Sequence, residues 1–514
     1  MLRSHAFSAL TVLAVLTVAG AAHADLPAPA PEATYGTQAA VQAAFMKGLD
    51  AAKANDLPGA RRNFTAALDD PAFGQIPPRV QYAILYLLGA TEFELKDYAL
   101  AYEHLTRAGQ TSPDLRELAY WRVLLDAAGG THRPEALADS LTDEATNAPA
   151  TLSEMDSRML SFDVYSIQTL KDDARTLRVL EALRAAHFQP NDPFITNEAW
   201  WMDLIRLYGQ AGRGDEARAL AASLSTPESV AALQSNKLYA DYAPKGADAY
   251  TAAVTTETAR LRAAAAAHPD RLEGANALAS RLMSDGRLDE ALSVIDAALA
   301  KTKTNTKSPG KSAFTDQGEQ LEWAYFHEAN ILAKLGRWDN AVAAQVKSRN
   351  ATSWDTISQK VNLGDIYYET GKPAQALDAV KSLTRNDGSP YGNMASEEVR
   401  ACAYAQQGKT AELAISMAFM KAHAADGYGP LRSALQCAGD SEGLAHLIVT
   451  QLDDPQQRAQ VLKDAQTWLP DPHPTPFQVK MTATRDAAMN RPEVRAAIDK
   501  YGVINTYPSF RSGN

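Results

Sequence analysis

The sequence predicts an all-α protein, an α-solenoid superhelix of stacked helical hairpins that covers about residues 38–465. Two observations lead to this prediction. The stretch "LGDIYYETGKPAQALDAV" (363–380) has the pattern of one hairpin, because an apolar helix is followed by Gly-Lys-Pro and then by a second apolar helix. Similar stretches recur along the chain, and the spacing between a glycine and an alanine stays the same inside them.

The constant spacing has a steric explanation. Glycine accepts the backbone angles of a tight helix connection, and a small residue in the first helix lets the second helix approach closely. A turn glycine precedes the alanine by five positions in the pairs Gly212–Ala217, Gly286–Ala291, Gly336–Ala341 and Gly371–Ala376, and a first-helix glycine precedes it by twelve in Gly48–Ala60, Gly89–Ala101 and Gly364–Ala376. An ordinary amphipathic helical bundle, which is the alternative fold, does not explain a spacing that is kept in separate copies.

These residues resemble the tetratricopeptide repeat family, whose unit is a helix–turn–helix of about 34 residues. The resemblance is clearest at 86–113 and 363–383. It is fair at 45–71, 201–224, 278–300 and 325–345, degenerate from 137 to 200, and weakened from 397 to 464. The resemblance implies a right-handed superhelix with one extended concave groove.

The first 24 residues have the pattern of a secretory signal. They contain a basic Arg3, an apolar run and the sequence Ala22-His23-Ala24, which is an A-x-A cleavage site. The apolar run is about half of the ~20 residues that a membrane-spanning helix needs. We therefore expect cleavage after Ala24 and a soluble, exported protein that resides in the periplasm.

The mature chain is expected to divide at a basic insertion. An Ala/Pro-rich linker (25–37) precedes the N-terminal part of the solenoid (38–300), and the C-terminal part covers 318–465. Between these parts, residues 301–317 begin with "KTKTNTKSPGK" and predict a surface loop. Prolines interrupt the helical pattern in the last segment (466–514), which we expect to form a cap with one short helix followed by an extended segment.

Charge and motifs argue against nucleic-acid binding and catalysis. A net charge of −11 repels phosphate backbones. The fragment "HEANI" (327–331) lacks the second histidine of a zinc-protease helix, and "SPGKS" (308–312) lacks the first glycine of a phosphate-binding loop. The ten histidines show no metal-ligand spacing. We therefore expect no catalytic residues, no metal and no cofactor.

The family resemblance implies which residues line the groove. In tetratricopeptide repeats the first helix of each hairpin contributes the exposed residues that contact a peptide or a protein segment. The matching positions here are Trp323, Phe326, Asn330, Asp365, Tyr368, Glu369, Tyr86 and Phe93. Aromatic rings beside amides and carboxylates suit an extended segment, although each ring has inter-repeat packing as its alternative role. Phe326 stands where the family's carboxylate-clamping groove needs a lysine.

Two cysteines, Cys402 and Cys437, lie 35 positions apart, which is about one repeat. In an oxidising compartment they can form a disulfide between neighbouring repeats. The alternative is a pair of packed thiols, because cysteine also behaves as a small hydrophobic residue. The sequence leaves both alternatives open.

The function that follows is a non-enzymatic exported scaffold, which binds a protein or peptide partner in its concave groove. The alternative is a cell-wall (peptidoglycan) enzyme or a glycan-binding accessory protein, because some soluble lytic transglycosylases carry a long helical superhelix. Such enzymes add a lysozyme-like domain, and no segment of ~150 residues escapes the helical pattern here.

Overall fold

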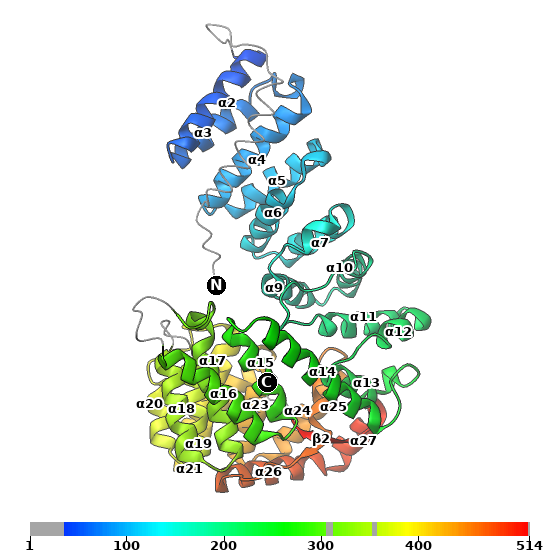
Figure 1. Cartoon of the computed structure of the whole chain (residues 1–514), viewed down its shortest axis with the longest axis vertical. Coiled ribbons are helices and arrows are strands. Elements are labelled where there is room, and N and C mark those ends of the chain that lie inside the picture. Colours follow the sequence, from blue (N-terminus) through cyan, green and yellow to red (C-terminus); the bar gives the residue numbers. More distant parts are fainter. Residues whose placement is uncertain (1–34, 305–311, 352–356, 512–514) are drawn as a thin grey trace. The chain divides into compact units, whose positions relative to one another are not determined.

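The computed structural model describes residues 35–304, 312–351 and 357–511, which are almost entirely helical (Figure 1). The expected signal peptide (1–24), most of the linker and the centre of the basic insertion lie outside the described residues. In the part that is described, no helix is long and apolar enough to cross a membrane.

The described residues form two compact units, which divide between Leu207 and Tyr208. The boundary after Leu207 falls inside the helix Glu198–Gln210, and the helices of the N-terminal unit mostly pair in sequence as hairpins. They are α2 (Gln38–Lys53), α3 (Leu57–Leu68), α4 (Pro78–Glu94), α5 (Tyr98–Thr111), α6 (Leu118–Gly130), α7 (Pro134–Asn147), α8 (Pro149–Leu152), α9 (Ser157–Gln168), α10 (Asp173–Ala185) and α11 (Glu198–Gln210), with 3₁₀ turns at Phe73–Gln75 and Pro113–Leu115.

The C-terminal unit continues the hairpins and adds two short strands. Its elements are α12 (Gly214–Ala221), α13 (Pro227–Ser235), α14 (Ala247–Ala267), α15 (Leu272–Ser284), α16 (Leu288–Thr304), α17 (Gln317–Lys334), α18 (Trp338–Ala351), α19 (Ile357–Glu369), α20 (Pro373–Val380), α21 (Pro390–Gln407), α22 (Thr410–Ala422), α23 (Tyr428–Ala438), α24 (Ser441–Asp453), α25 (Arg458–Asp464), β1 (Thr467–Leu469), α26 (Pro476–Met489), α27 (Pro492–Tyr501) and β2 (Thr506–Phe510), with 3₁₀ turns at Lys237–Tyr239 and Ala424–Asp426. This architecture confirms the predicted all-α solenoid.

The small residues of the repeat lie where the helices of a hairpin meet. The alanines that define the spacing are fully buried, with 0% exposure at Ala60, Ala101, Ala217, Ala291, Ala341 and Ala376. A Cβ atom added to Gly48 would lie 2.5 Å from the Phe64 ring, and one added to Gly89 would lie 2.7 Å from Leu105. Glycine at these positions is therefore required by close helix packing.

The turn inside each hairpin has a residue in the left-handed backbone region. In the C-terminal unit this residue is glycine, with φ between +67° and +77° at Gly286, Gly336, Gly371, Gly408 and Gly439. In the N-terminal unit Asn55, Lys96 and Lys171 take the same conformation, with φ of 57°, 64° and 56°. They precede buried residues of the second helix by the same five positions, namely Ala60, Ala101 and Thr176. The turn geometry is therefore kept where the glycine is lost.

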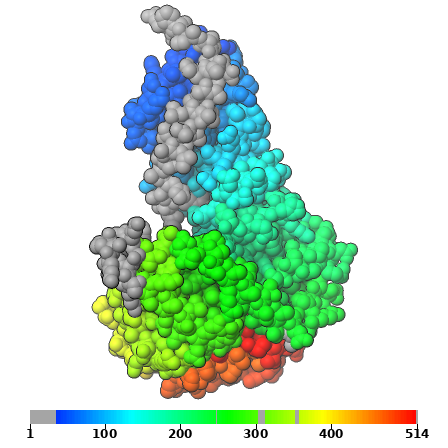
Figure 2. All heavy atoms as spheres, viewed as in Figure 1, coloured from blue at the N-terminus to red at the C-terminus, as the bar shows by residue number. Residues whose placement is uncertain are grey.

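The C-terminal segment returns to the first helices of its own unit. Strand β1 pairs in parallel with β2, and Tyr507 of β2 packs between Tyr250 of α14 and Trp468, at centroid distances of 4.4 and 4.9 Å. The Val503 amide donates to the Ser235 carbonyl at 2.9 Å. In the space-filling view the red C-terminal residues accordingly touch the green residues of the same unit (Figure 2). The first and last parts of this unit are therefore in contact.

Three predicted boundaries are corrected. The units divide at residue 207 instead of at the basic insertion, because the returning segment joins α13 and α14 to the C-terminal helices. Residues 301–304 are the end of α16 and not a loop. The C-terminal cap contains a second helix, α26, since Pro476 occupies its first turn and Thr475 supplies a capping box.

Candidate binding groove of the C-terminal unit

The first helices of four hairpins direct one residue each toward the C-terminal segment. This residue lies two positions before the turn glycine, and its four examples form what we call the tail row. They are Lys334 of α17, Glu369 of α19, Gln406 of α21 and Cys437 of α23. Because the helical register is the same in successive stacked hairpins, side chains at this position project in one direction.

Residues 470–487, which we call the strap, run along the tail row. At the start of the strap, Asp471 pairs with Lys334 at 3.5 Å between Oδ2 and Nζ. The next contact is made by the indole of Trp338, whose Nε1 donates to the His473 carbonyl at 3.2 Å. Both contacts hold an extended part of the strap against the ends of α17 and α18.

The helical part of the strap contacts the next two hairpins. The Phe477 ring packs edge-on against Tyr368, with 6.1 Å between their centroids. The Met481 sulfur lies 3.7 Å from Cys437 Sγ. The ends of α17, α19, α21 and α23 therefore form one surface along which the chain's own strap lies, and we call this surface the groove.

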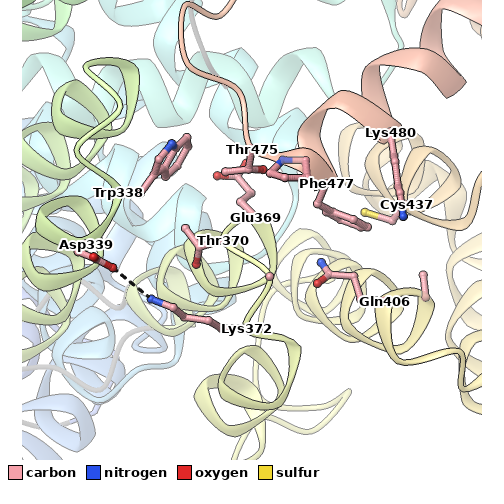
Figure 3. Close-up of a pocket in the computed structure, with 13 residues that line it drawn as sticks. Trp338, Asp339, Glu369, Thr370, Lys372, Gln406, Cys437, Thr475, Phe477 and Lys480 are labelled. Atoms are coloured by element: carbon pink, nitrogen blue, oxygen red, sulfur yellow. Dashed lines mark ion pairs between the residues drawn. The ribbon is translucent and has the colours of Figure 1, made fainter.

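A cavity of about 610 Å³ remains between the strap and the hairpin ends. Trp338 lies on one side of it, and Phe477 and Lys480 lie on the other (Figure 3). At its edge, Lys372 pairs with Asp339 at 3.8 Å. This mixed lining of aromatic rings and charges suits a peptide segment better than a purely apolar ligand.

Three carboxyl groups on α19 and α21 interact electrostatically on the inner face. Burial raises the pKa of Glu398 to about 8 and the pKa of Glu369 to about 7. Burial, assisted by the charges of Glu398 and Glu369, also raises the pKa of Asp365. Tyr368 donates to Glu398 Oε1 at 3.3 Å. The described part of the chain contains no group of His, Cys, Asp or Glu residues that could hold a metal ion, so this acidic cluster offers protonation or pairing with a cationic group.

The three predicted groove residues of α17 are partly exposed. The rings of Trp323 and Phe326 meet edge to face at 5.7 Å, and Phe326 also packs on His327 at 5.6 Å. Burial lowers the pKa of His327 to about 4, so this imidazole is neutral at physiological pH. Trp323, Phe326 and Asn330 thus remain predicted partner-binding residues.

Two aromatic residues that we expected to be exposed in the groove are buried. Tyr368 is 3% exposed and packs between α21 and the strap, while Tyr86 is 2% exposed and contacts Tyr120 of the next hairpin at 6.5 Å. Phe93 is half-buried against Tyr98, with 5.6 Å between the rings. The expected exposure of Tyr86 and Tyr368 is therefore wrong, because neighbouring first helices lie close enough for these rings to pack between repeats.

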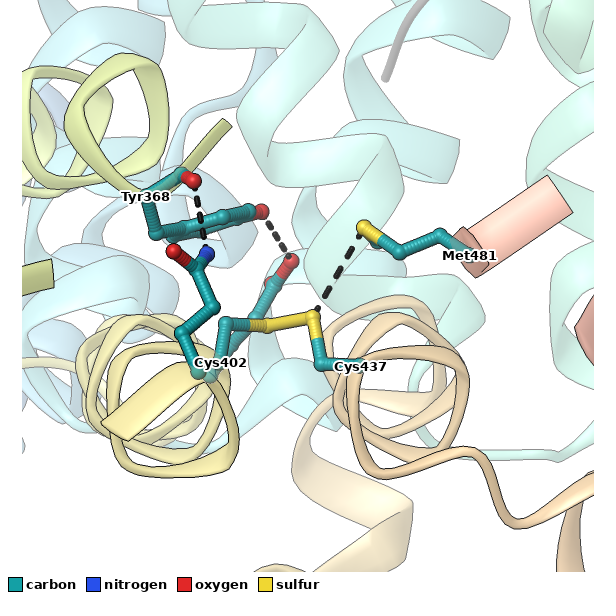
Figure 4. Close-up of a disulfide and its surroundings, with 6 residues drawn as sticks. Tyr368, Cys402, Cys437 and Met481 are labelled. Atoms are coloured by element: carbon teal, nitrogen blue, oxygen red, sulfur yellow. Dashed lines mark hydrogen bonds between the residues drawn. A yellow bond between two sulfur atoms is a disulfide. The ribbon is translucent and has the colours of Figure 1, made fainter. Parts of the chain in front are cut away.

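A disulfide joins Cys402 of α21 to Cys437 of α23 (Figure 4). It connects the first helices of two neighbouring hairpins, and Cys402 is fully buried. Gln406, one turn after Cys402, donates to the Tyr368 carbonyl at 2.6 Å. The disulfide therefore fixes two members of the tail row relative to each other.

Sequence reasoning missed several residues of the groove. Glu398 occupies in α21 the position that Phe326 occupies in α17, ten residues before the turn glycine. Lys334 and Gln406 share the position of Glu369, two residues before that glycine. The register was available in the sequence, but the contact with the strap was not, because the strap is distant along the chain.

Comparison with known proteins agrees with this architecture. A family profile described as "Tetratricopeptide repeat" matches residues 45–114, which cover α2 from residue 45, all of α3 and the hairpin α4–α5. Residues 45–114 therefore contain tetratricopeptide repeats. None of the curated proteins matches the sequence.

Three solved structures are similar to this chain at low scores. A tetratricopeptide repeat protein from Parabacteroides merdae ATCC 43184 is 12% identical, with 74% of this chain and 99% of that chain covered and a TM-score of 0.28. The APC/C hetero-tetramer Cut9–Hcn1 is 13% identical, with 90% and 96% covered and a TM-score of 0.29. The TPR domain of P58(IPK) is 14% identical, with 80% and 98% covered and a TM-score of 0.21. These values are too low to transfer a binding site from any of the three.

Proposed function

We propose that this chain is an exported, non-enzymatic scaffold that binds an extended segment of another protein along the inner face of the C-terminal unit. The observation that carries the proposal is the tail row, because it already holds a piece of polypeptide that is extended before Pro476 and helical after it, with a cavity of about 610 Å³ beside it. A surface built from stacked hairpin ends offers the same contacts to a second protein.

The partly exposed pair of Trp323 and Phe326 is the proposed aromatic anchor. A well-packed aromatic anchor typically contributes about 2 kcal/mol, or roughly thirtyfold in affinity. Capture of partners from an envelope extract by the mature chain tests this. The double variant Trp323→Ala/Phe326→Ala should lose most of the captured protein while its helical content stays the same. Ile415→Ala, which changes a residue of α22 that is 61% exposed, is the matched control.

Export is part of the same proposal and has its own test. A full-length chain that carries residues 1–24 should be recovered from the periplasmic fraction with Asp25 as its first residue. Recovery of the uncut chain from the cytoplasmic fraction would contradict export.

The alternative function, a cell-wall enzyme or glycan-binding accessory, is favoured by one observation. Glu398 has a raised pKa of about 8, and a carboxyl group that stays protonated near neutral pH is what a glycosidic general acid requires. Incubation with isolated peptidoglycan decides between the two. Release of soluble glycan that is lost in Glu398→Gln would support the alternative and contradict the scaffold.

A further inference from the structure

The strap is weakly held between two firmly anchored flanks. Of residues 470–487, only Thr475 is buried. Before the strap, Val461 and Leu462 of α25 belong to the core, and after it Ile498 of α27 is also buried there. A segment that buries little apolar surface opens at a low free-energy cost, whereas its flanks open only with the rest of the fold.

Separate contacts hold the extended part of the strap, residues 470–475, and α26 also packs on α23 and α24. Asp471 and Lys334 pair where both side chains are partly exposed, and a single hydrogen bond from Trp338 follows. Phe477 is only half-buried on Tyr368, and the cavity lies beside it. Each of these contacts can be replaced by an equivalent group from another chain.

The sequence of the strap shows what kind of segment the groove accepts. In "LPDPHPTPF" (469–477) every second residue from 470 to 476 is proline. Proline lacks an N–H donor and favours an extended, polyproline-like backbone. Such a segment offers its carbonyls and side chains, and these are the groups that Trp338 and Lys334 contact.

We infer that the strap is a displaceable occupant of the groove, and that the external partner is an extended, proline-rich segment with a carboxylate for Lys334 and an aromatic ring for Tyr368. The partner part of this inference rests on the proposed function, but the opening of the strap does not. Displacement lowers the apparent affinity of the partner, because only the fraction of molecules with an open strap can bind it.

Hydrogen exchange on the mature, disulfide-bonded chain tests the opening. Peptides from 470–487 should exchange faster than peptides from β2 and α27, and Phe477→Ala should accelerate exchange in the strap alone. Val479→Ala, which changes a residue of α26 that is 53% exposed, is the control and should have no effect. Protection of the strap equal to that of β2 in the wild-type chain would overturn the inference.

A labelled synthetic peptide of residues 467–483, measured by fluorescence anisotropy, tests the occupancy. It should bind Phe477→Ala roughly tenfold more tightly than the wild type, because the internal competitor has lost its aromatic contact. Val479→Ala should bind it as the wild type does. If Phe477→Ala does not fold, Asp471→Asn replaces it, since Asp471 is exposed and its change removes the pairing with Lys334 and the charge that acts on Glu369.

The two tests separate this inference from the proposed function. Equal peptide affinity in all variants, or no binding to any of them, would overturn the displaceable strap. A mobile strap and a variant-dependent peptide affinity, combined with no partner captured from the envelope, would support the strap and contradict the scaffold function.

Discussion

At the scale of single residues, the position with positive φ in each hairpin turn affects stability directly, because the free energy of that backbone conformation differs between glycine and other residues. A non-glycine residue with positive φ costs about 1–2 kcal/mol relative to its preferred conformations. Lys96 bears this cost at φ 64°, whereas Gly371 avoids it at φ 72°. A Cβ atom added to Gly371 would meet nothing within 4 Å, so its substitution changes only the backbone term.

We therefore expect opposite effects from two substitutions at equivalent positions. Gly371→Ala should lower the free energy of unfolding by about 1 kcal/mol. Lys96→Gly should raise it by only about 0.5 kcal/mol, because the greater entropy of glycine in the unfolded chain offsets part of the relieved backbone strain. Urea denaturation measures both changes. The same sign for the two variants would show that the shared turn geometry does not control stability.

The acidic cluster predicts how stability depends on pH. The folded-state pKa values of Glu398 and Glu369, about 8 and about 7, lie above their ordinary value of 4.5. Their contribution to the free energy of unfolding is therefore greatest below about pH 4.5, and it is lost as the pH rises through 7 and 8. The Tm should fall from pH 5.5 to 8.5, and Glu398→Gln should flatten this decline. Glu412→Gln, an exposed change on α22, is the control, and an equal effect of both variants would contradict the cluster as the cause.

Residue roles were predictable to the extent that they depend on the repeat. The buried alanines and the packing glycines follow from local helix geometry, so spacing was sufficient to identify them. The exposure of Tyr86 and Tyr368 was not predictable, because it depends on how closely the next hairpin and the strap approach. Burial of an aromatic ring in a repeat is a property of neighbours that the repeat motif itself does not encode.

At the scale of elements, a proline can interrupt a helix or begin one, and the sequence alone did not separate these two roles in the C-terminal cap. The prolines of 470–474 lie in a segment without helix or strand, and the helical pattern is interrupted there as predicted. Pro476 instead begins α26, because the first turn of a helix needs no N–H at this position and Thr475 caps it. The second helix of the cap was therefore missed, while α27 and the extended strand after it were predicted.

The disulfide between α21 and α23 should contribute to the stability of the fold. With a sequence separation of 35, this bond should stabilise the fold by about 4 kcal/mol. Thiol titration of the unfolded, unreduced mature protein should find no free thiol. Cys402→Ala/Cys437→Ala should melt earlier than the wild type, and two titratable thiols in the wild-type chain would contradict the bond.

At the scale of the whole molecule, the sequence could predict a repeat array but not the contacts between the first and last parts of the C-terminal unit. Stacked repeats contact only their neighbours, and their stability is then nearly a sum of local terms. In the C-terminal unit, β2 adds contacts to α14 and α15, and α25 adds contacts to α13, across more than half of the unit's length. Local periodicity contains no information about such contacts.

This closure predicts that the C-terminal unit unfolds as one cooperative unit. Tyr507 is 2% exposed and packs on Tyr250 and Trp468, so Tyr507→Ala should cost about 3–5 kcal/mol. The loss should accelerate hydrogen exchange in α13 and α14 together with α25, although these helices are far apart in the sequence. Val503→Ala, an exposed change beside β2, should leave their exchange unchanged. If Tyr507→Ala affected only β2 and the segment next to it, the unit would behave as an open array of independent repeats, and the contact between its first and last helices would contribute nothing to its cooperativity.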